Sequence, residues 1–179
     1  MIFDRNEKKQ VVALLGAGSM GTAIVRRIAA GKKILLGDIS AHALERVSDD
    51  FRRSGYDVET CVVNALEKES IEAFAKKAAE LGPVMYFIDT AGASPNQASP
   101  EHIVALDMVG TGYAVDAFGR VMAEGGAGLI ISSQAAYMYP IPNDDELQIV
   151  NATFINGTDL LIDGGVIPSI RTGMFKLQG

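Results

Sequence analysis

Residues 11–38, which read VVALLGAGSMGTAIVRRIAAGKKILLGD, constrain the fold more than any other stretch of the chain. They begin with a continuous apolar run, Val11–Leu15, as a strand buried on both faces requires. Three glycines follow in G-x-G-x-x-G spacing, apolar residues then recur at helical spacing, and a second apolar run ends at Asp38. This order predicts a strand, a tight turn, a helix and a second strand.

The glycine positions have a specific chemical meaning. Gly16 allows a tight exit from the strand, and Gly18 has no Cβ, so a pyrophosphate can approach the backbone. Gly21 lets the helix pack against the sheet. The free N–H groups at the start of that helix, around Ser19 and Met20, would then hold the phosphates. The spacing predicts a dinucleotide-binding turn; the alternative is a turn whose glycines serve packing only.

Asp38 ends the second strand about 20 residues beyond the glycines, where such a unit holds a ribose. Its carboxylate can accept hydrogen bonds from both hydroxyls of an adenosine ribose, whereas a 2′-phosphate would meet like charge. The sequence therefore favours NAD over NADP as the cofactor. Ile39, the next residue, is expected in the same site.

Composition limits the other function classes. The chain has 179 residues, enough for one domain with a full core, and its formal net charge of −6 argues against a nucleic-acid surface. Cys61 is the sole cysteine, which excludes an intrachain disulfide and fits a reducing compartment. We recognise no signal peptide, no run of membrane-spanning length and no metal-ligand spacing, so we expect a cytoplasmic protein that binds neither membrane nor metal.

Strand and helix signals alternate along the rest of the chain. Ser40 and Ser99 can cap helices, and Asn64 and Glu67 have capping-box spacing. The helices are predicted at 41–54, from Asn64 and Glu67 to 81, and from 99–101 to about 124; the remaining strands at 58–63, 84–88 and 128–132. Five strands and four helices in alternation predict a single α/β domain with a Rossmann-type, doubly wound parallel sheet.

Ligands in such sheets lie outside the carboxyl ends of the strands. That rule selects the residues that follow each predicted strand. They are the glycine turn, Asp38, Val63 and Asn64, the DTAG turn of Asp89, Thr90, Ala91 and Gly92, and Ser132 with Ser133. The DTAG turn suits the floor of a cofactor site, although a plain strand-to-loop turn would read the same way.

Three segments resemble the short-chain dehydrogenase/reductase family. DTAG is similar to the family's N-N-A-G turn, ISSQAA (131–136) to its fifth strand, and FINGTDLLIDGG (154–165) to its closing F-I-T-G-x-x-L-x-V-D-G-G. The resemblance places the catalytic serine at Ser133. It implies NAD(P)-linked interconversion of an alcohol and a ketone, with a small-molecule substrate, and a homo-oligomer.

The chain also departs from the family's pattern. Its glycine turn is one residue shorter, Val62 stands in place of an aspartate after the third strand, and Asp107 in place of an asparagine in the long helix. The Tyr-x-x-x-Lys pair, which the resemblance makes the proton donor and its helper, is absent: Tyr137 is followed four residues later by Ile141.

Two explanations of that absence are open. Either a segment is missing between about residues 140 and 153 and the numbering continues across the gap, which we favour, or the deletion is real. A real deletion would leave a regulatory or scaffold protein that binds a nucleotide without turnover. Another Rossmann reductase and, more remotely, a methyltransferase that binds S-adenosylmethionine are further alternatives, because both open with a similar glycine turn.

Overall fold

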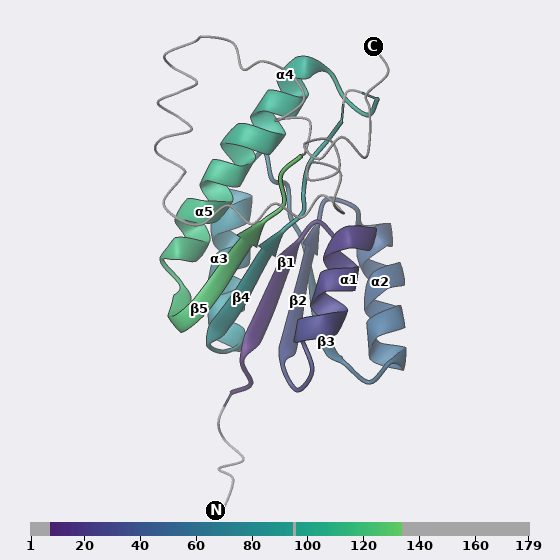
Figure 1. The fold of residues 1–179 in the computed structure, drawn as a ribbon, viewed down its shortest axis with the longest axis vertical. Helices are drawn as coiled ribbons and strands as arrows, with labels where there is room; N and C mark the ends of the chain where they lie inside the picture. Colours follow the sequence, from purple (N-terminus) through teal and green to yellow (C-terminus); the bar gives the residue numbers. More distant parts are fainter. Residues whose placement is uncertain (1–7, 95, 134–179) are drawn as a thin grey trace, which may run out of the picture. The chain divides into compact units, whose positions relative to one another are not determined.

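A five-stranded parallel sheet forms the centre of the protein in the computed structural model, which describes residues 8–94 and 96–133 (Figure 1). The strands lie in the order β3-β2-β1-β4-β5. Their bounds are β1 Val11–Leu15, β2 Lys33–Asp38, β3 Asp57–Val62, β4 Val84–Asp89 and β5 Met122–Ile130. The predicted Rossmann-type parallel sheet is confirmed.

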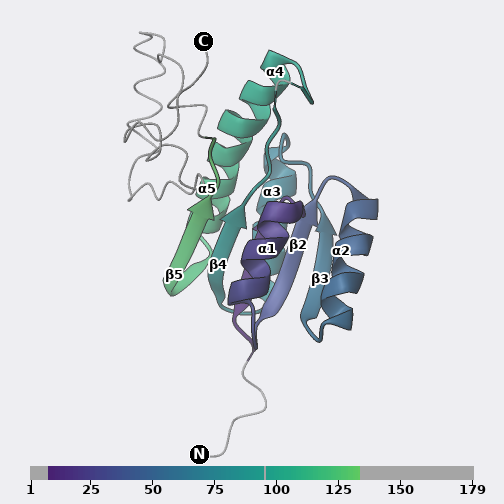
Figure 2. The same cartoon turned by 45° about the vertical axis from the view of Figure 1, so that its right-hand side comes forward.

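Helices cover both faces of the sheet, as the views of Figures 1 and 2 agree. The helices are α1 Ser19–Ile28, α2 Ala41–Arg53, α3 Lys68–Leu81, α4 Pro100–Ile103, the π-helical segment η1 Val104–Gly110, and α5 Thr111–Gly119. Helices α1 and α2 pack on one face, and α3 and α5 pack on the other.

The apolar run of β1 fits a sheet that helices cover on both faces. Val12 and Leu14 belong to the core beneath α1 and α2, whereas Val11, Ala13 and Leu15 belong to the core beneath α3 and α5. Successive side chains of a strand point to opposite faces, so a strand between two cores must be apolar at every position. All five residues of β1 are buried, as the sequence predicts.

The strand order reverses beside β1. Leu15, its last residue, pairs with Gly37 of β2 on one side and with Asp89 of β4 on the other. The chain leaves β1 towards β2 on one side and leaves β4 towards β5 on the other side. Doubly wound sheets bind ligands where two such connections diverge.

The region before β5 differs from the prediction. The predicted helix to about residue 124 ends at Gly119, and the predicted strand 128–132 is β5, which begins earlier, at Met122. Gly125 has a φ of 76°, and the β4–β5 register shifts between the pair Val84–Met122 and the pair Tyr86–Ala127. This irregular first half of β5 carries no strand-like alternation, so the sequence did not reveal it.

The predicted capping box at the start of α3 is also absent. Asn64 Oδ1 accepts a hydrogen bond from the backbone N–H of Leu66, and its Nδ2 donates to Glu67 Oε1 at 2.8 Å. Glu67 is itself the N-cap residue of α3, and its side chain accepts no hydrogen bond from the N–H groups of the first turn. Asn64 therefore stabilises the turn before the helix rather than the helix end.

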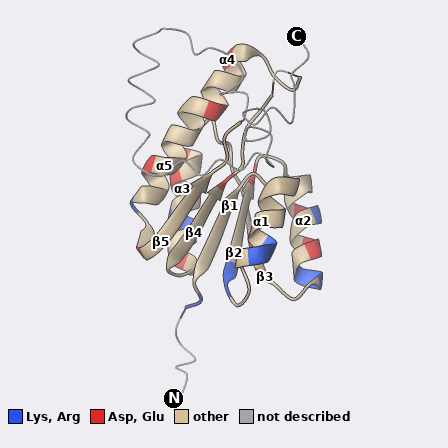
Figure 3. Ribbon diagram, in the orientation of Figure 1, with Lys and Arg blue, Asp and Glu red and all other residues tan. Residues whose placement is uncertain are grey.

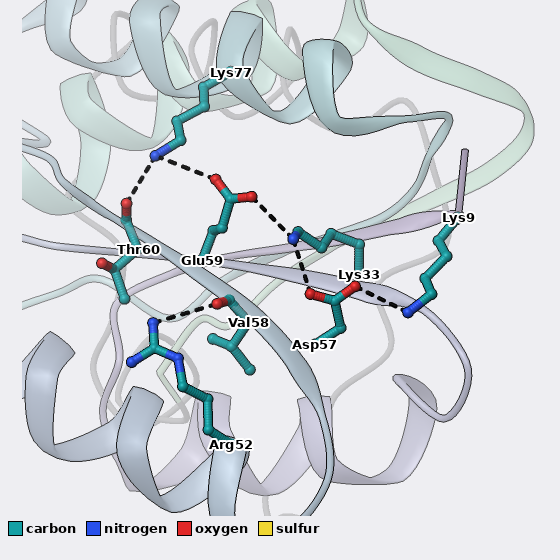
Figure 4. Close-up of polar contacts among 8 residues, drawn as sticks. All are labelled: Lys9, Lys33, Arg52, Asp57, Val58, Glu59, Thr60 and Lys77. Carbon is teal, nitrogen blue, oxygen red and sulfur yellow. Dashed lines mark hydrogen bonds and ion pairs between the residues drawn. The ribbon is translucent and has the colours of Figure 1, made fainter. Parts of the chain in front are cut away.

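An ion-pair network crosses the edge of the sheet where β2 and β3 begin (Figure 4). Lys33 Nζ lies 2.8 Å from Asp57 Oδ1 and 2.9 Å from Glu59 Oε1, and Lys9 and Lys77 extend the chain of charges at either end. Lys33 and Asp57 are the first residues of their strands. The network therefore lies at the opposite edge from the predicted ligand site.

The described residues up to Ile130 form one compact unit, and residues 131–133 belong to a second unit. The FINGTDLLIDGG segment, the possible gap between 140 and 153, and the boundaries of a single domain over 1–179 lie outside the described residues and stay predictions. None of the helices in the described ranges is long and apolar enough to cross a membrane.

Candidate functional site

The carboxyl-terminal edge of β1, β2 and β4 brings together the glycine turn, Asp38 and the DTAG turn. Figure 3 shows acidic residues at this edge and basic residues near the end of α1 and the start of β2. The three segments are far apart in the sequence and become neighbours because their strands are parallel and adjacent.

The glycine turn is in direct contact with the DTAG turn. Gly16 has a φ of 89°, and a Cβ there would lie 2.6 Å from the backbone nitrogen of Ala91. A Cβ on Gly21 would lie 2.6 Å from Thr90 Oγ1. Both glycines are therefore required by a close backbone approach. The sequence predicted the turn and the helix packing, but not that DTAG is the partner.

Gly18 lies on the open side of the same turn. A Cβ there would have no atom within 4 Å. Gly18 is also the N-cap of α1, and among residues 8–94 and 96–133 no side chain caps this helix end. The N–H groups of the first turn, at Ser19, Met20 and Gly21, are thus not occupied by a capping side chain, and Met20 is exposed. An uncapped helix end beside open space fits a phosphate group.

Asp38 fixes the shape of the glycine turn. Its Oδ2 accepts a hydrogen bond of 2.8 Å from the backbone N–H of Ala17, and its Oδ1 accepts one of 2.8 Å from that of Ser40. Each carboxylate oxygen has a further lone pair, so two ribose hydroxyls can still be accepted. Ile39 beside it is two-thirds exposed. The geometry fits the predicted ribose site.

Val63 and Asn64 contribute to this edge in another way than expected. The Val63 side chain is 1% exposed and packs in the core, while its N–H donates to the carbonyl of Asp38 at 2.9 Å. Asn64 uses both ends of its amide within its own turn. Exposed apolar surface comes instead from Val62, which ends β3.

The DTAG turn is anchored from three sides. The Thr90 N–H donates to the carbonyl of Leu15, and its Oγ1 donates to that of Gly16, both at 2.8 Å. Asp89 accepts from the N–H of Ala91 at 3.0 Å, and Asp107 on η1 accepts from that of Ala93 at 3.0 Å. These four hydrogen bonds hold the turn in place beside the glycine turn.

Asp89 opens the DTAG turn that the sequence selected, but its burial and its shifted pKa were not predicted. It is 2% exposed, and burial raises the pKa of its carboxyl to about 6, while the N–H of Ala91 lowers that pKa and the charge of Asp107 raises it. The available signal was a carboxyl group at the end of an apolar strand. A perturbed carboxyl at a strand end is typical of a functional edge.

A shallow hollow of about 190 Å³ opens beside the start of α1. Gly18, Ser19 and Thr22 line it from one helix, and Arg46 and Asp50 line it from α2. Arg46 is exposed and forms no ion pair with any residue in the described part of the chain. The sequence offered no signal for Arg46, because its position depends on how α2 packs beside α1.

Ser133 is exposed and lies beyond β5, in the unit 131–179. Its predicted catalytic role is not tested by the described residues, and Tyr137 lies outside them. Within residues 8–94 and 96–133, no three His, Cys, Asp or Glu side chains gather closely enough to hold a metal ion.

Comparison with known proteins decides between the Rossmann families. The family model described as short chain dehydrogenase matches residues 10–143. The chain belongs to the short-chain dehydrogenase/reductase family. Members of this family are generally oxidoreductases, and the matched residues include the glycine turn, Asp38, DTAG and Ser133.

Individual relatives of this short-chain dehydrogenase/reductase support the same family assignment. The chain is 38% identical to the short-chain dehydrogenase/reductase bsc3 of Alternaria brassicicola over 72% of its own length and 47% of the relative's. It is 32% identical to a galactitol 2-dehydrogenase (L-tagatose-forming) of Cereibacter sphaeroides, over 67% of its own length and 50% of the relative's. The chain therefore spans about half the length of the curated relatives it matches.

A solved structure shows the same fold. The short-chain dehydrogenase/reductase of Burkholderia phymatum, determined in complex with NAD, superposes with a TM-score of 0.65 at 23% identity, over 74% of this chain and 52% of that one. At this identity the likeness concerns the fold alone.

Proposed function

We propose that this protein is an NAD(P)-dependent oxidoreductase that interconverts an alcohol and a ketone. The observation that carries the proposal is the glycine turn, which Asp38 holds open beside an uncapped helix end. Family membership supplies the reaction class, and the galactitol 2-dehydrogenase among the relatives makes polyols and their ketoses the first substrates to test.

Each part of the edge has a role in this proposal. Gly18 leaves open space for the pyrophosphate, the N–H groups at Ser19 and Met20 hold it, and Asp38 accepts the ribose hydroxyls. Thr90, Ala91 and Gly92 form the wall beside it, and Ile39 with Val62 offers apolar surface to the adenine. When bound, the nicotinamide supplies or accepts a hydride.

Three finer statements are part of the proposal. NAD is preferred over NADP, because the Asp38 carboxylate would repel a 2′-phosphate. Ser133 donates a hydrogen bond to the substrate oxygen, by its place in the ISSQAA segment. A homo-oligomer, expected from the resemblance of the closing segment, is also proposed.

The test is a pair of titrations of the full chain with NADH and with NADPH, followed by turnover assays. We expect NADH to bind at least about tenfold more tightly than NADPH, which corresponds to roughly 1.4 kcal/mol. Turnover is assayed on galactitol and a panel of other alcohols and ketones. Failure to bind either dinucleotide would exclude the proposal; binding without turnover on any substrate would favour a nucleotide-binding protein without catalysis.

A further inference from the structure

The hollow between α1 and α2 adjoins the glycine turn. Ala17 and Gly18 line it from the turn, and Arg46 and Asp50 line it from α2. Ala17 is also the residue whose backbone N–H donates to Asp38 Oδ2 at 2.8 Å. The hollow, of about 190 Å³, therefore lies next to the carboxylate that we assign to the ribose hydroxyls.

The two charged side chains that line this hollow differ in their partners. The Asp50 carboxylate forms an ion pair with Arg26 of α1, whose Cζ also lies 4.5 Å from the centre of the Phe51 ring. Arg46 is exposed, and it forms neither an ion pair nor a side-chain hydrogen bond with any residue among 8–94 and 96–133. Arg46 therefore brings to the hollow a positive charge that this part of the chain does not neutralise.

The remaining arginines of these two helices do not offer a charge to the hollow. Arg27 donates to a backbone carbonyl of its own helix at 2.7 Å, and Arg52 forms an ion pair with Asp49 at 3.3 Å. Arg53 is exposed in the last turn of α2 and does not line the hollow. Arg46 is thus the arginine of α1 and α2 that combines an unneutralised charge with a place beside the glycine turn.

A phosphate on the 2′-oxygen of an adenosine ribose needs a cation close to this place. Such a phosphate is repelled by the carboxylate of Asp38, and an arginine nearby is the usual counter-charge. A guanidinium group can bind two phosphate oxygens through parallel N–H bonds. The hydroxyl of Ser19, which also lines the hollow, can donate one more hydrogen bond. The chemistry of the lining fits this phosphate group.

We propose that Arg46 is a specificity-determining residue of the cofactor site, which binds the 2′-phosphate of NADP(H) in the hollow between α1 and α2. Asp38 makes NADH the preferred cofactor, while Arg46 limits how strongly NADPH is rejected. The inference rests on the proposed function, because it extends the ligand class of that same site. It adds that the chain binds both nucleotides and that two oppositely charged residues set the ratio of their affinities.

Arg46→Met removes the guanidinium and keeps an unbranched side chain at an exposed position of α2. In fluorescence titrations of the full chain we expect NADPH affinity to fall about tenfold and NADH affinity to change by less than about twofold. Arg53→Met, the same substitution at the end of the same helix, is the matched control and should keep both affinities. Equal losses for the two nucleotides in Arg46→Met, no loss for either, or the same loss of NADPH affinity in Arg53→Met would each overturn the proposal.

Fragments of the nucleotide separate this inference from the proposed function. Calorimetric titrations of the full chain with adenosine 2′,5′-bisphosphate and with adenosine 5′-monophosphate report the 2′-phosphate contact without nicotinamide and without turnover. Arg46→Met should weaken binding of the bisphosphate about tenfold and leave that of the monophosphate unchanged. If the wild type binds NADH and Arg46→Met does not weaken the bisphosphate, the role of Arg46 is rejected while the proposed function stands. If no turnover is found, the oxidoreductase proposal fails and the fragments still decide on Arg46, because a wild type that does not bind the bisphosphate also rejects its role.

Discussion

The Asp38 carboxylate accepts a 2.8 Å hydrogen bond from the backbone N–H of Ala17, in the middle of the glycine turn. One side chain at the end of β2 therefore both shapes the turn after β1 and faces the proposed ribose site. The shape of the phosphate-binding turn and the choice of nucleotide are coupled through the same two oxygens.

Substitution of Asp38 tests this coupling. In Asp38→Asn the amide can accept from the N–H of Ala17 or that of Ser40 through one oxygen only, because its nitrogen is a donor. We expect NADH affinity to fall about tenfold and NADPH affinity to fall less or to rise, because the negative charge is gone. The check is a pair of fluorescence titrations, with Asp49→Asn on the exposed face of α2 as control. Equal losses for both nucleotides would remove Asp38 as the basis of NAD preference.

The approach of the two turns makes a clear prediction for glycine. Gly16→Ala forces a Cβ against the backbone of Ala91 in addition to the strain of a positive φ, so the free energy of unfolding should fall by about 2–4 kcal/mol. Gly31→Ala is the matched control, since Gly31 has a φ of 74° but open space around it. It should cost about 1 kcal/mol. Urea unfolding of both variants measures the difference, and similar losses would show that crowding contributes nothing.

The buried carboxyl of Asp89 makes stability depend on pH. The pKa of Asp89 is raised from 3.8 to about 6 in the folded chain, mainly by burial. The folded state therefore binds more protons than the unfolded state between about pH 4 and pH 6, and the free energy of unfolding falls as pH rises through that window.

Asp89→Asn removes this dependence. Above about pH 6 the variant should be more stable than the wild type by up to about 3 kcal/mol, and the advantage should shrink towards pH 4. Urea unfolding across this range measures it. A variant that is less stable at every pH would show that the charge of Asp89 is compensated in the folded protein.

The ion-pair network at the far edge of the sheet should contribute modestly to stability. The hydrogen bond between the side chains of Lys33 and Asp57 raises the pKa of Lys33 and lowers the pKa of Asp57. Lys33→Met keeps most of the aliphatic chain and leaves Asp57 and Glu59 with one lysine each, so we expect a loss of about 1 kcal/mol or less, smaller at high salt.

Lys76→Met is the matched control for that network. Its ion pair with Glu80 is exposed and 4.0 Å long, so we expect no measurable change in the free energy of unfolding. Urea unfolding at low and at high salt compares the two variants. A loss that is equal in both, or independent of salt, would show that the network does not act through its charges.

Features encoded by neighbouring residues could be predicted from the sequence. Val11–Leu15, the glycine spacing and Asp38 lie within one short stretch, so their periodicity and spacing identify the strands, the turn and the acid. The Ser99 cap, which accepts from the N–H of His102, was predictable for the same reason. The end of α5 and the start of β5 were not, because the irregular register opposite β4 is what forms that part of β5.

The sequence by itself determined the parallel sheet, the dinucleotide-type turn and the family, because these follow from periodicity, glycine spacing and motifs that lie within short segments. Only the tertiary structure placed Ala91 against Gly16, buried Asp89 and brought Asp107 to the DTAG turn. Those relationships join residues that are adjacent only after the sheet is assembled and the helices pack on it. Burial and close approach are properties of that packing, so no local pattern contains them.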